Sequence, residues 1–233
     1  MGKKIIGILM LIIAILSLIG SIANGSLFED RGSAAATYGG FIGTLLPILL
    51  YVISGIFLIV FDSAAKSGAS KGFNKRKAQC SGIIVLFVLW SLLAILVIFA
   101  ASINSGATGN FLSFLMIIPY LFPVLTFDAM LQYALPYLSC RKHFYSDSTG
   151  YEQYLNAGTL VSYSADKKVL ANSKALIFPE LFCAVPFDSI ASVKLSKQLW
   201  EQDVYFNLTN GKKFCIISKK YNEIMAAINA NKI

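Results

Sequence analysis

The sequence predicts an integral membrane protein: an all-α bundle of four transmembrane helices, followed by a small cytosolic α+β domain at the C-terminal end. Hydrophobic residues make up 56% of the 233 residues, charged residues make up only 14%, and the mean hydropathy is +0.67. This is too much apolar side chain for a water-soluble fold. The composition changes near residue 146, where regular charges and turn residues replace the long apolar runs. We therefore expect a transmembrane domain over residues 1–142 and a second domain over residues 146–233.

Four segments are long and apolar enough to cross a bilayer as helices, since a hydrocarbon core of about 30 Å takes roughly 20 helical residues. They are residues 5–23, 41–61, 83–103 and 111–138. A spanning barrel is not expected, because it would need alternating strands that the sequence lacks. Pro119 and Pro123 interrupt the fourth segment, so we expect a kink there, with the last part tilted or interfacial and ending near Pro136.

The positions of Lys and Arg predict the orientation, because translocation retains these residues in the cytosol. Three groups belong on one side: Lys3 and Lys4, the basic residues of 66–77, and Arg141 with Lys142. The connection near Glu29 to Arg31 carries a single cation, and the connection over residues 104–110 carries no charge. Both ends of the chain are therefore expected in the cytosol.

The N-terminus also fits a cleaved signal peptide. Lys3 and Lys4 precede an apolar run, and Ser21-Ile22-Ala23 is a small-x-small pattern. Cleavage would remove the first span and leave the other three in the same orientation. Both interpretations stay open from the sequence.

Two carboxylates end apolar segments and are candidate intramembrane polar residues. Asp62 follows Phe61 and Asp128 follows Phe127, each at the predicted cytosolic end of a span. Ionisable groups in a bilayer are costly and usually functional, so one hypothesis is a small transporter or channel component that uses both carboxylates and the proline-containing fourth helix. It would work as a homo-oligomer, because four spans with so few polar residues enclose little water. The simpler interpretation places both carboxylates among headgroups and water.

A basic segment lies between the second and third spans and supplies candidate contacts to anionic lipid headgroups. These residues are Lys66, Lys71, Lys75, Arg76 and Lys77. Each cation next to the inner leaflet is worth about 1 kcal/mol of attraction to anionic lipid. Retention of positive charge in the cytosol predicts the same loop without any specific lipid site.

Short apolar runs separated by turn residues predict a strand-rich domain after residue 146. The expected strands are 160–163, 168–171, 176–178, 181–185, 190–195, 204–209 and 212–217. Asn210-Gly211 predicts a two-residue type I′ turn between the last two strands. That turn would pair Leu208 with Lys213, Phe206 with Cys215 and Val204 with Ile217. Ser218 is the expected N-cap of a closing helix over residues 219–229.

The order of these elements carries a family resemblance. It consists of the segment Lys168 to Phe178, the link Val185-Pro186-Phe187-Asp188-Ser189-Ile190, the Asn210-Gly211 hairpin and the helix from Tyr221. Over roughly residues 150–233 the tail resembles small bacterial pleckstrin-homology-like (PH-like) or GRAM-like domains, while a generic α+β domain is the alternative. The resemblance implies a module that binds lipid or a protein partner, in a membrane-anchored scaffold or regulatory protein of a bacterial plasma membrane.

The sequence predicts no enzyme, no cofactor and no metal site. His143 is the one histidine of the chain, and it lies in a basic stretch beside Arg141 and Lys142, which is typical of a solvated flanking residue rather than of a catalytic or metal-binding one. The net charge of +8 does not predict nucleic-acid binding, because the basic residues are divided among loops that flank apolar runs. The four cysteines are widely spaced on the expected cytosolic side and are predicted to be free thiols: Cys80, Cys140, Cys183 and Cys215.

Overall fold

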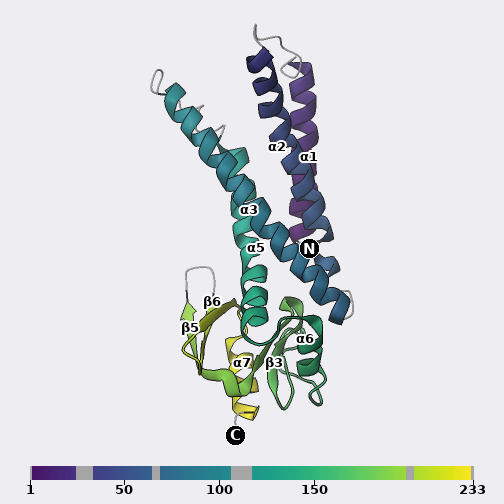
Figure 1. The fold of residues 1–233 in the computed structure, drawn as a ribbon, viewed down its shortest axis with the longest axis vertical. Helices are drawn as coiled ribbons and strands as arrows, with labels where there is room; N and C mark the ends of the chain where they lie inside the picture. The colour runs from purple at the N-terminus through teal and green to yellow at the C-terminus, as the bar shows by residue number, and fades with distance from the viewer. Residues whose placement is uncertain (1, 25–33, 65–68, 106–116, 198–201, 232–233) are drawn as a thin grey trace. The chain divides into compact units, whose positions relative to one another are not determined.

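The computed structural model describes residues 2–24, 34–64, 69–105, 117–197 and 202–231 (Figure 1). The chain forms two compact units, which we describe separately. The first unit comprises Met1–Asp62 and Val85–Phe127, and the second comprises Ser63–Ile84 and Asp128–Ile233. The sequence predicted a division after residue 142 instead, so parts of two helices expected in the transmembrane domain belong to the second unit.

Within the described residues, four long helices contribute to the first unit, and two of them also contribute to the second. They are α1 (Gly2–Ala23), α2 (Ala34–Val60), α3 (Ala69–Ser105) and α5 (Ile118–His143). A short 3₁₀ turn, η1 (Phe61–Ser63), follows α2. Of the described helices, three are long and apolar enough to cross a membrane: α1, residues 43–60 of α2 and residues 69–99 of α3.

The predicted fourth span is not among these three. Its first residues lie outside the described part of the chain, so a four-helix membrane domain stays a prediction. The expected end near Pro136 is wrong, because α5 continues to His143.

Helices α1 and α2 run side by side (Figure 1). Glycine allows their close approach, since a Cβ atom at Gly7 would lie 2.7 Å from the carbonyl oxygen of Gly55. Elsewhere in this unit, the buried Trp90 Nε1 donates a hydrogen bond of 2.9 Å to Ser54 Oγ. Interhelical polar contacts of this kind stabilise helix pairs in lipid. Apolar side chains alone do not drive helices together there, because lipid tails are equally apolar. Leu96 and Leu125 are more than 60% exposed on the same unit, as expected for a surface that faces lipid.

The described strands of the second unit form two antiparallel sheets. The first has the order β1 (Val161–Ser162), β2 (Leu170–Ala171), β3 (Ala175–Phe178) and β4 (Cys183–Pro186). The second has the order β5 (Ile190–Lys197), β6 (Gln202–Leu208) and β7 (Lys213–Ile217). Two 3₁₀ turns, η2 (Pro179–Leu181) and η3 (Phe187–Ser189), flank β4. The expected strand-rich domain is therefore present.

Two helices pack on the sheets, and the sequence predicted one of them. Helix α7 (Tyr221–Asn231) contacts β3, and its buried residues include Ile224, Ala227 and Ile228. Helix α6 (Ser148–Leu155) contacts β4 and was not expected, because Gly150 in its first turn weakens the helical pattern. Its signal is the N-cap Asp147, whose side chain accepts a hydrogen bond of 2.9 Å from the Gly150 amide.

The predicted turn and register of the last hairpin are wrong by one residue. The connection has three residues, Thr209 to Gly211, closed by a 2.8 Å hydrogen bond from the Leu208 amide to the Lys212 carbonyl. Phe206 therefore pairs with Phe214, and Tyr205 pairs with Cys215. The extra residue puts both phenylalanine side chains on the buried face, where their rings stack with centroids 4.8 Å apart. Burial of the large apolar residues on one face fixes this register.

Gly211 allows the three-residue turn, because its φ of +78° lies in the left-handed region. We expect Gly211→Ala to destabilise the protein by about 1 kcal/mol, since a Cβ is disfavoured at this φ. The measurement is the apparent Tm of the full chain in detergent. Thr209→Ala, in the same exposed turn, is the control and should leave the Tm within error. Equal Tm values for both variants would contradict the turn geometry.

Candidate functional site

The second unit contains a cleft between one face of α5 and the β6–β7 hairpin, with a volume of about 560 Å³. This volume lies in the range of small-molecule binding sites. We call it the α5–hairpin cleft. The residues that line it are Asp128, Ala129, Leu131, Gln132, Leu135, Pro136, Ser139, Asp203, Lys213, Phe214 and Cys215. Residues 128, 132, 135 and 139 share a helix face because they are spaced at three and four residues.

Apolar side chains form much of the cleft wall. Leu131 and Leu135 come from α5, and Phe214 comes from β7. Phe214 is fixed by its stack on Phe206 and by an edge contact with Phe144 at 6.3 Å between ring centroids. Leu135 is 57% exposed, so apolar surface at the cleft is open to a ligand. This wall suits a hydrocarbon chain.

Polar side chains gather on the hairpin side of the cleft. Asp203 is only 7% exposed, and the Tyr205 hydroxyl lies 3.4 Å from its Oδ2 as a hydrogen-bond donor. Burial, with the nearby Asp203 carboxylate as a smaller cause, raises the pKa of the Cys215 thiol to about 11. Cys215 is therefore a neutral thiol at physiological pH and a poor nucleophile.

The structure brings one of the two predicted carboxylates into this cleft. Asp128 is exposed and lines this cleft from α5. Asp62 belongs to the first unit, where its backbone forms part of η1, and its side chain is outside the described residues. Sequence reasoning did not identify Asp203 and Lys213 as site residues, because neither belongs to a ligand-binding motif and Lys213 was expected only as a strand residue of the last hairpin.

The expected basic loop is largely helix. Lys71, Lys75 and Lys77 are exposed on the N-terminal part of α3, whereas Lys66 lies outside the described residues. Arg76 differs from these residues because it is 2% exposed. Its Nη2 donates a hydrogen bond of 2.9 Å to the Glu180 carbonyl oxygen, and its guanidinium lies 5.7 Å from the centroid of the Phe182 ring. The sequence suggested Arg76 as a contact to lipid headgroups, but its side chain is buried and packs inside the second unit.

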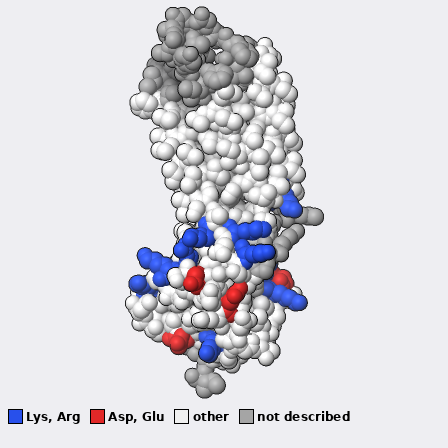
Figure 2. Space-filling view, turned by 45° about the vertical axis from the view of Figure 1, so that its right-hand side comes forward, with Lys and Arg blue, Asp and Glu red and all other residues white. Residues whose placement is uncertain are grey.

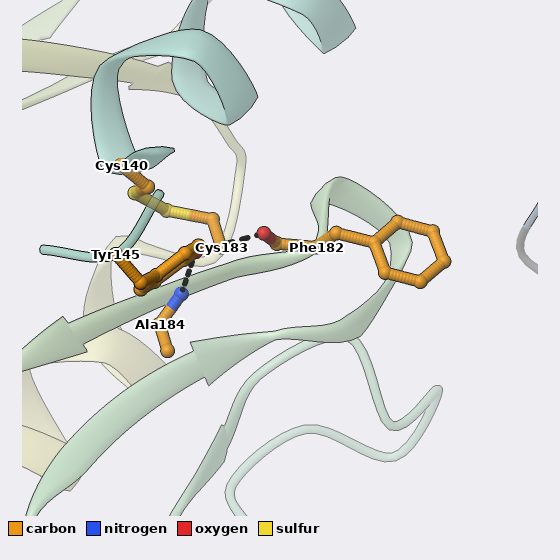
Figure 3. Close-up of a disulfide and its surroundings, with 5 residues drawn as sticks. All are labelled: Cys140, Tyr145, Phe182, Cys183 and Ala184. Atoms are coloured by element: carbon orange, nitrogen blue, oxygen red, sulfur yellow. Dashed lines mark hydrogen bonds between the residues drawn. A yellow bond between two sulfur atoms is a disulfide. The ribbon is translucent and has the colours of Figure 1, made fainter. Parts of the chain in front are cut away.

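Tyr145 fixes the segment around Phe182 to the end of α5 (Figure 3). Its hydroxyl donates a hydrogen bond of 2.8 Å to the Phe182 carbonyl and accepts one of 3.0 Å from the Ala184 amide. Burial raises the pKa of Tyr145 well above its usual value, so the hydroxyl keeps its proton and can donate. Phe182 itself has a φ of +50°.

The expectation of four free thiols is wrong for two cysteines. Cys140 of α5 and Cys183 of β4 form a disulfide, with Cα atoms 5.7 Å apart (Figure 3). They are separated by 43 residues in the sequence, so only the fold brings them together. Cys80 and Cys215 are free cysteines.

The described residues give little support for a metal site. No group of three or more His, Cys, Asp or Glu side chains in the described part of the chain could hold a metal ion. Desolvation, with Lys212 and Lys142 as further causes, lowers the pKa of His143. Comparison with protein-family models, curated proteins and solved structures finds no match to the chain.

Arg76 and its neighbour Lys75 provide a matched pair that separates internal packing from surface charge. We expect Arg76→Ala to destabilise the protein by about 2 to 4 kcal/mol, because it removes a charged hydrogen bond and a contact with an aromatic face. Lys75→Ala should change stability by less than about 0.5 kcal/mol. Thermal unfolding of the full chain in detergent measures both. A Tm loss for Lys75→Ala alone would contradict the buried position of Arg76.

Thiol counting tests the Cys140–Cys183 disulfide. Denatured protein treated with maleimide should gain two labels without reductant and four after reduction, because two of the four cysteines are paired. Intact mass measures the labels. Cys140→Ser is the control and should show three labels without reductant, since it frees Cys183. Four labels on the unreduced wild-type chain would show that the pair is reduced in the cell.

Proposed function

We propose that this chain is a membrane-anchored binding protein whose second unit binds lipid in the α5–hairpin cleft. The apolar helices α1, α2 and α3 support the anchor. A four-stranded and a three-stranded antiparallel sheet followed by α7, all within the described residues, support the resemblance to a PH-like domain. Such a module implies binding or regulation rather than catalysis.

The observation that carries the proposal is the position and lining of the cleft. Its lining begins at Asp128, directly after the residue that ends the apolar run of α5. We propose that α5 completes the predicted fourth span and that Asp128 lies near headgroup depth, where a charged residue of a spanning helix costs least. The cleft then combines an apolar wall, Leu131, Leu135 and Phe214, with charged side chains. That combination suits an amphiphile, which needs both kinds of contact.

A second, smaller hollow of about 230 Å³ lies beside Gln132 and Tyr133 and has three lysines in its lining. Two of these lysines form ion pairs: Lys168 with Glu180 at 3.3 Å, and Lys220 with Asp166 at 3.4 Å. Their charge is largely compensated within the protein, so this hollow attracts an anionic headgroup less than its lysines suggest. The α5–hairpin cleft is therefore the better candidate.

Orientation follows the distribution of positive charge. We propose a plasma membrane, with both chain ends and the second unit in the cytosol. Lys and Arg side chains gather over the second unit on the face drawn in Figure 2, with Asp and Glu side chains between them. Exposed Lys71, Lys75 and Lys77 would then lie near anionic headgroups, and a cytosolic protein is the alternative partner. Disulfides are rare in the reducing cytosol, so the Cys140–Cys183 disulfide argues against this placement of the second unit.

The transport hypothesis stays a prediction. It needs Asp62 and Asp128 to act on one path, and the side chain of Asp62 lies outside the described residues. Asp128 lines a cleft of the second unit, which gives it a role in ligand binding without a membrane-spanning path.

Photocrosslinking tests lipid binding in the cleft. The full chain in nanodiscs that contain a phospholipid with a diazirine in its acyl chain should be labelled on peptides from residues 128–139 and 213–215. Leu135→Trp should reduce that labelling about tenfold, because the indole fills the cleft from an exposed position. Leu125→Trp, at another exposed position of the same helix, is the matched control and should leave cleft labelling unchanged. Labelling confined to α1, α2 and α3 would contradict the proposal.

A further inference from the structure

The α5–hairpin cleft carries charges of both signs, which restricts the headgroup it can accept. We propose that it selects a lipid whose headgroup joins a primary ammonium to a phosphate, as in phosphatidylethanolamine. This inference rests on the proposed function, because it identifies the ligand of the same cleft. It depends on Asp128, Asp203 and Lys213.

Carboxylates outnumber cations among the described residues that line the cleft. The lining contains two carboxylates, Asp128 and Asp203, and one lysine, Lys213, so its formal net charge is minus one. Asp203 is nearly buried, and electrostatic interactions there are screened less than at the surface. A headgroup that carries only negative charge is repelled by this lining, whereas one with a cationic end is attracted.

Lys213 supplies the complementary charge. In the β6–β7 ladder Asp203 pairs with Ile217 and Lys213 pairs with Asn207, so Asp203 and Lys213 lie toward opposite ends of one hairpin face. A dipolar headgroup can then place its ammonium toward Asp203 and its phosphate toward Lys213, which is exposed. The acyl chains follow the wall formed by Leu131 and Leu135.

The lining favours a primary ammonium over a quaternary one. Carboxylate oxygens and the Gln132 amide oxygen accept hydrogen bonds, and a primary ammonium offers three donors whereas a choline group offers none. Proteins bind choline groups in cages of several aromatic rings. Among the described residues of this lining Phe214 is the single aromatic, which does not make a cage.

The test compares three diazirine-bearing lipids with identical acyl chains in nanodiscs of phosphatidylglycerol that hold the full chain. Labelling of the cleft peptides should be about fivefold higher for the phosphatidylethanolamine probe than for the phosphatidylcholine or phosphatidylglycerol probe. Asp128→Asn should remove this preference; because Asp128 is exposed, the substitution should not disturb the fold. Asp203→Asn should act in the same direction. Asp188→Asn, an exposed carboxylate outside the cleft, is the matched control and should keep the preference.

Each outcome separates this inference from the proposed function. Equal cleft labelling by the three probes, or a preference that survives Asp128→Asn, overturns the headgroup assignment and leaves lipid binding intact. Absence of cleft labelling by every probe overturns both. Soluble phosphoethanolamine should compete much less than lysophosphatidylethanolamine, because it lacks the chain that contacts the apolar wall. Equal competition would show that the cleft binds the free headgroup and would overturn the lipid assignment.

Discussion

The hydroxyl of Tyr145 makes two hydrogen bonds on which the arrangement of the second unit depends. It binds the backbone on both sides of Cys183, at the Phe182 carbonyl and the Ala184 amide. This places the Phe182 ring where Arg76 of α3 lies over it. Helix α3 approaches closely, since a Cβ atom at Gly72 would lie 2.5 Å from Cζ of that ring. One buried tyrosine therefore connects the end of α5 to β4 and to the phenylalanine that α3 packs against, and α5 in turn forms one wall of the cleft.

Part of the fold could be predicted from the sequence, because lipid as a solvent requires spanning helices to be long and apolar. Lipid favours long uniform apolar runs, so α1 and α2 were expected close to their observed ranges. The sequence predicts a loop where the N-terminal part of α3 lies, because lysines interrupt the apolar residues there. Phe73, Arg76 and Cys80 are buried and spaced at three and four residues, which is helical spacing. That spacing was the available signal.

The remaining features depend on long-range packing that one sequence does not encode locally. Asn210-Gly211 is compatible with two turns, and the choice between them follows from burial of Phe214 beside Phe206 rather than from the turn residues. The pairing of Cys140 with Cys183 likewise follows from how α5 meets β4. The cleft combines residues from α5, β6 and β7, and only the correct hairpin register puts Asp203, Lys213 and Cys215 on one face.

Under the proposed function, an anchor in the membrane would change what lipid binding by the second unit can accomplish. A soluble lipid-binding domain needs affinity to reach the bilayer, whereas a unit joined to spanning helices already experiences a high effective lipid concentration. Surface lysines worth about 1 kcal/mol each add little to attachment by such helices. In the proposed site, the nearly buried Asp203 would act where salt screens charges less, so its contribution would be to discriminate between ligands. Under the proposed function, the binding free energy in this cleft would reflect the composition of the surrounding leaflet, because little of it is needed to bring the second unit to the membrane.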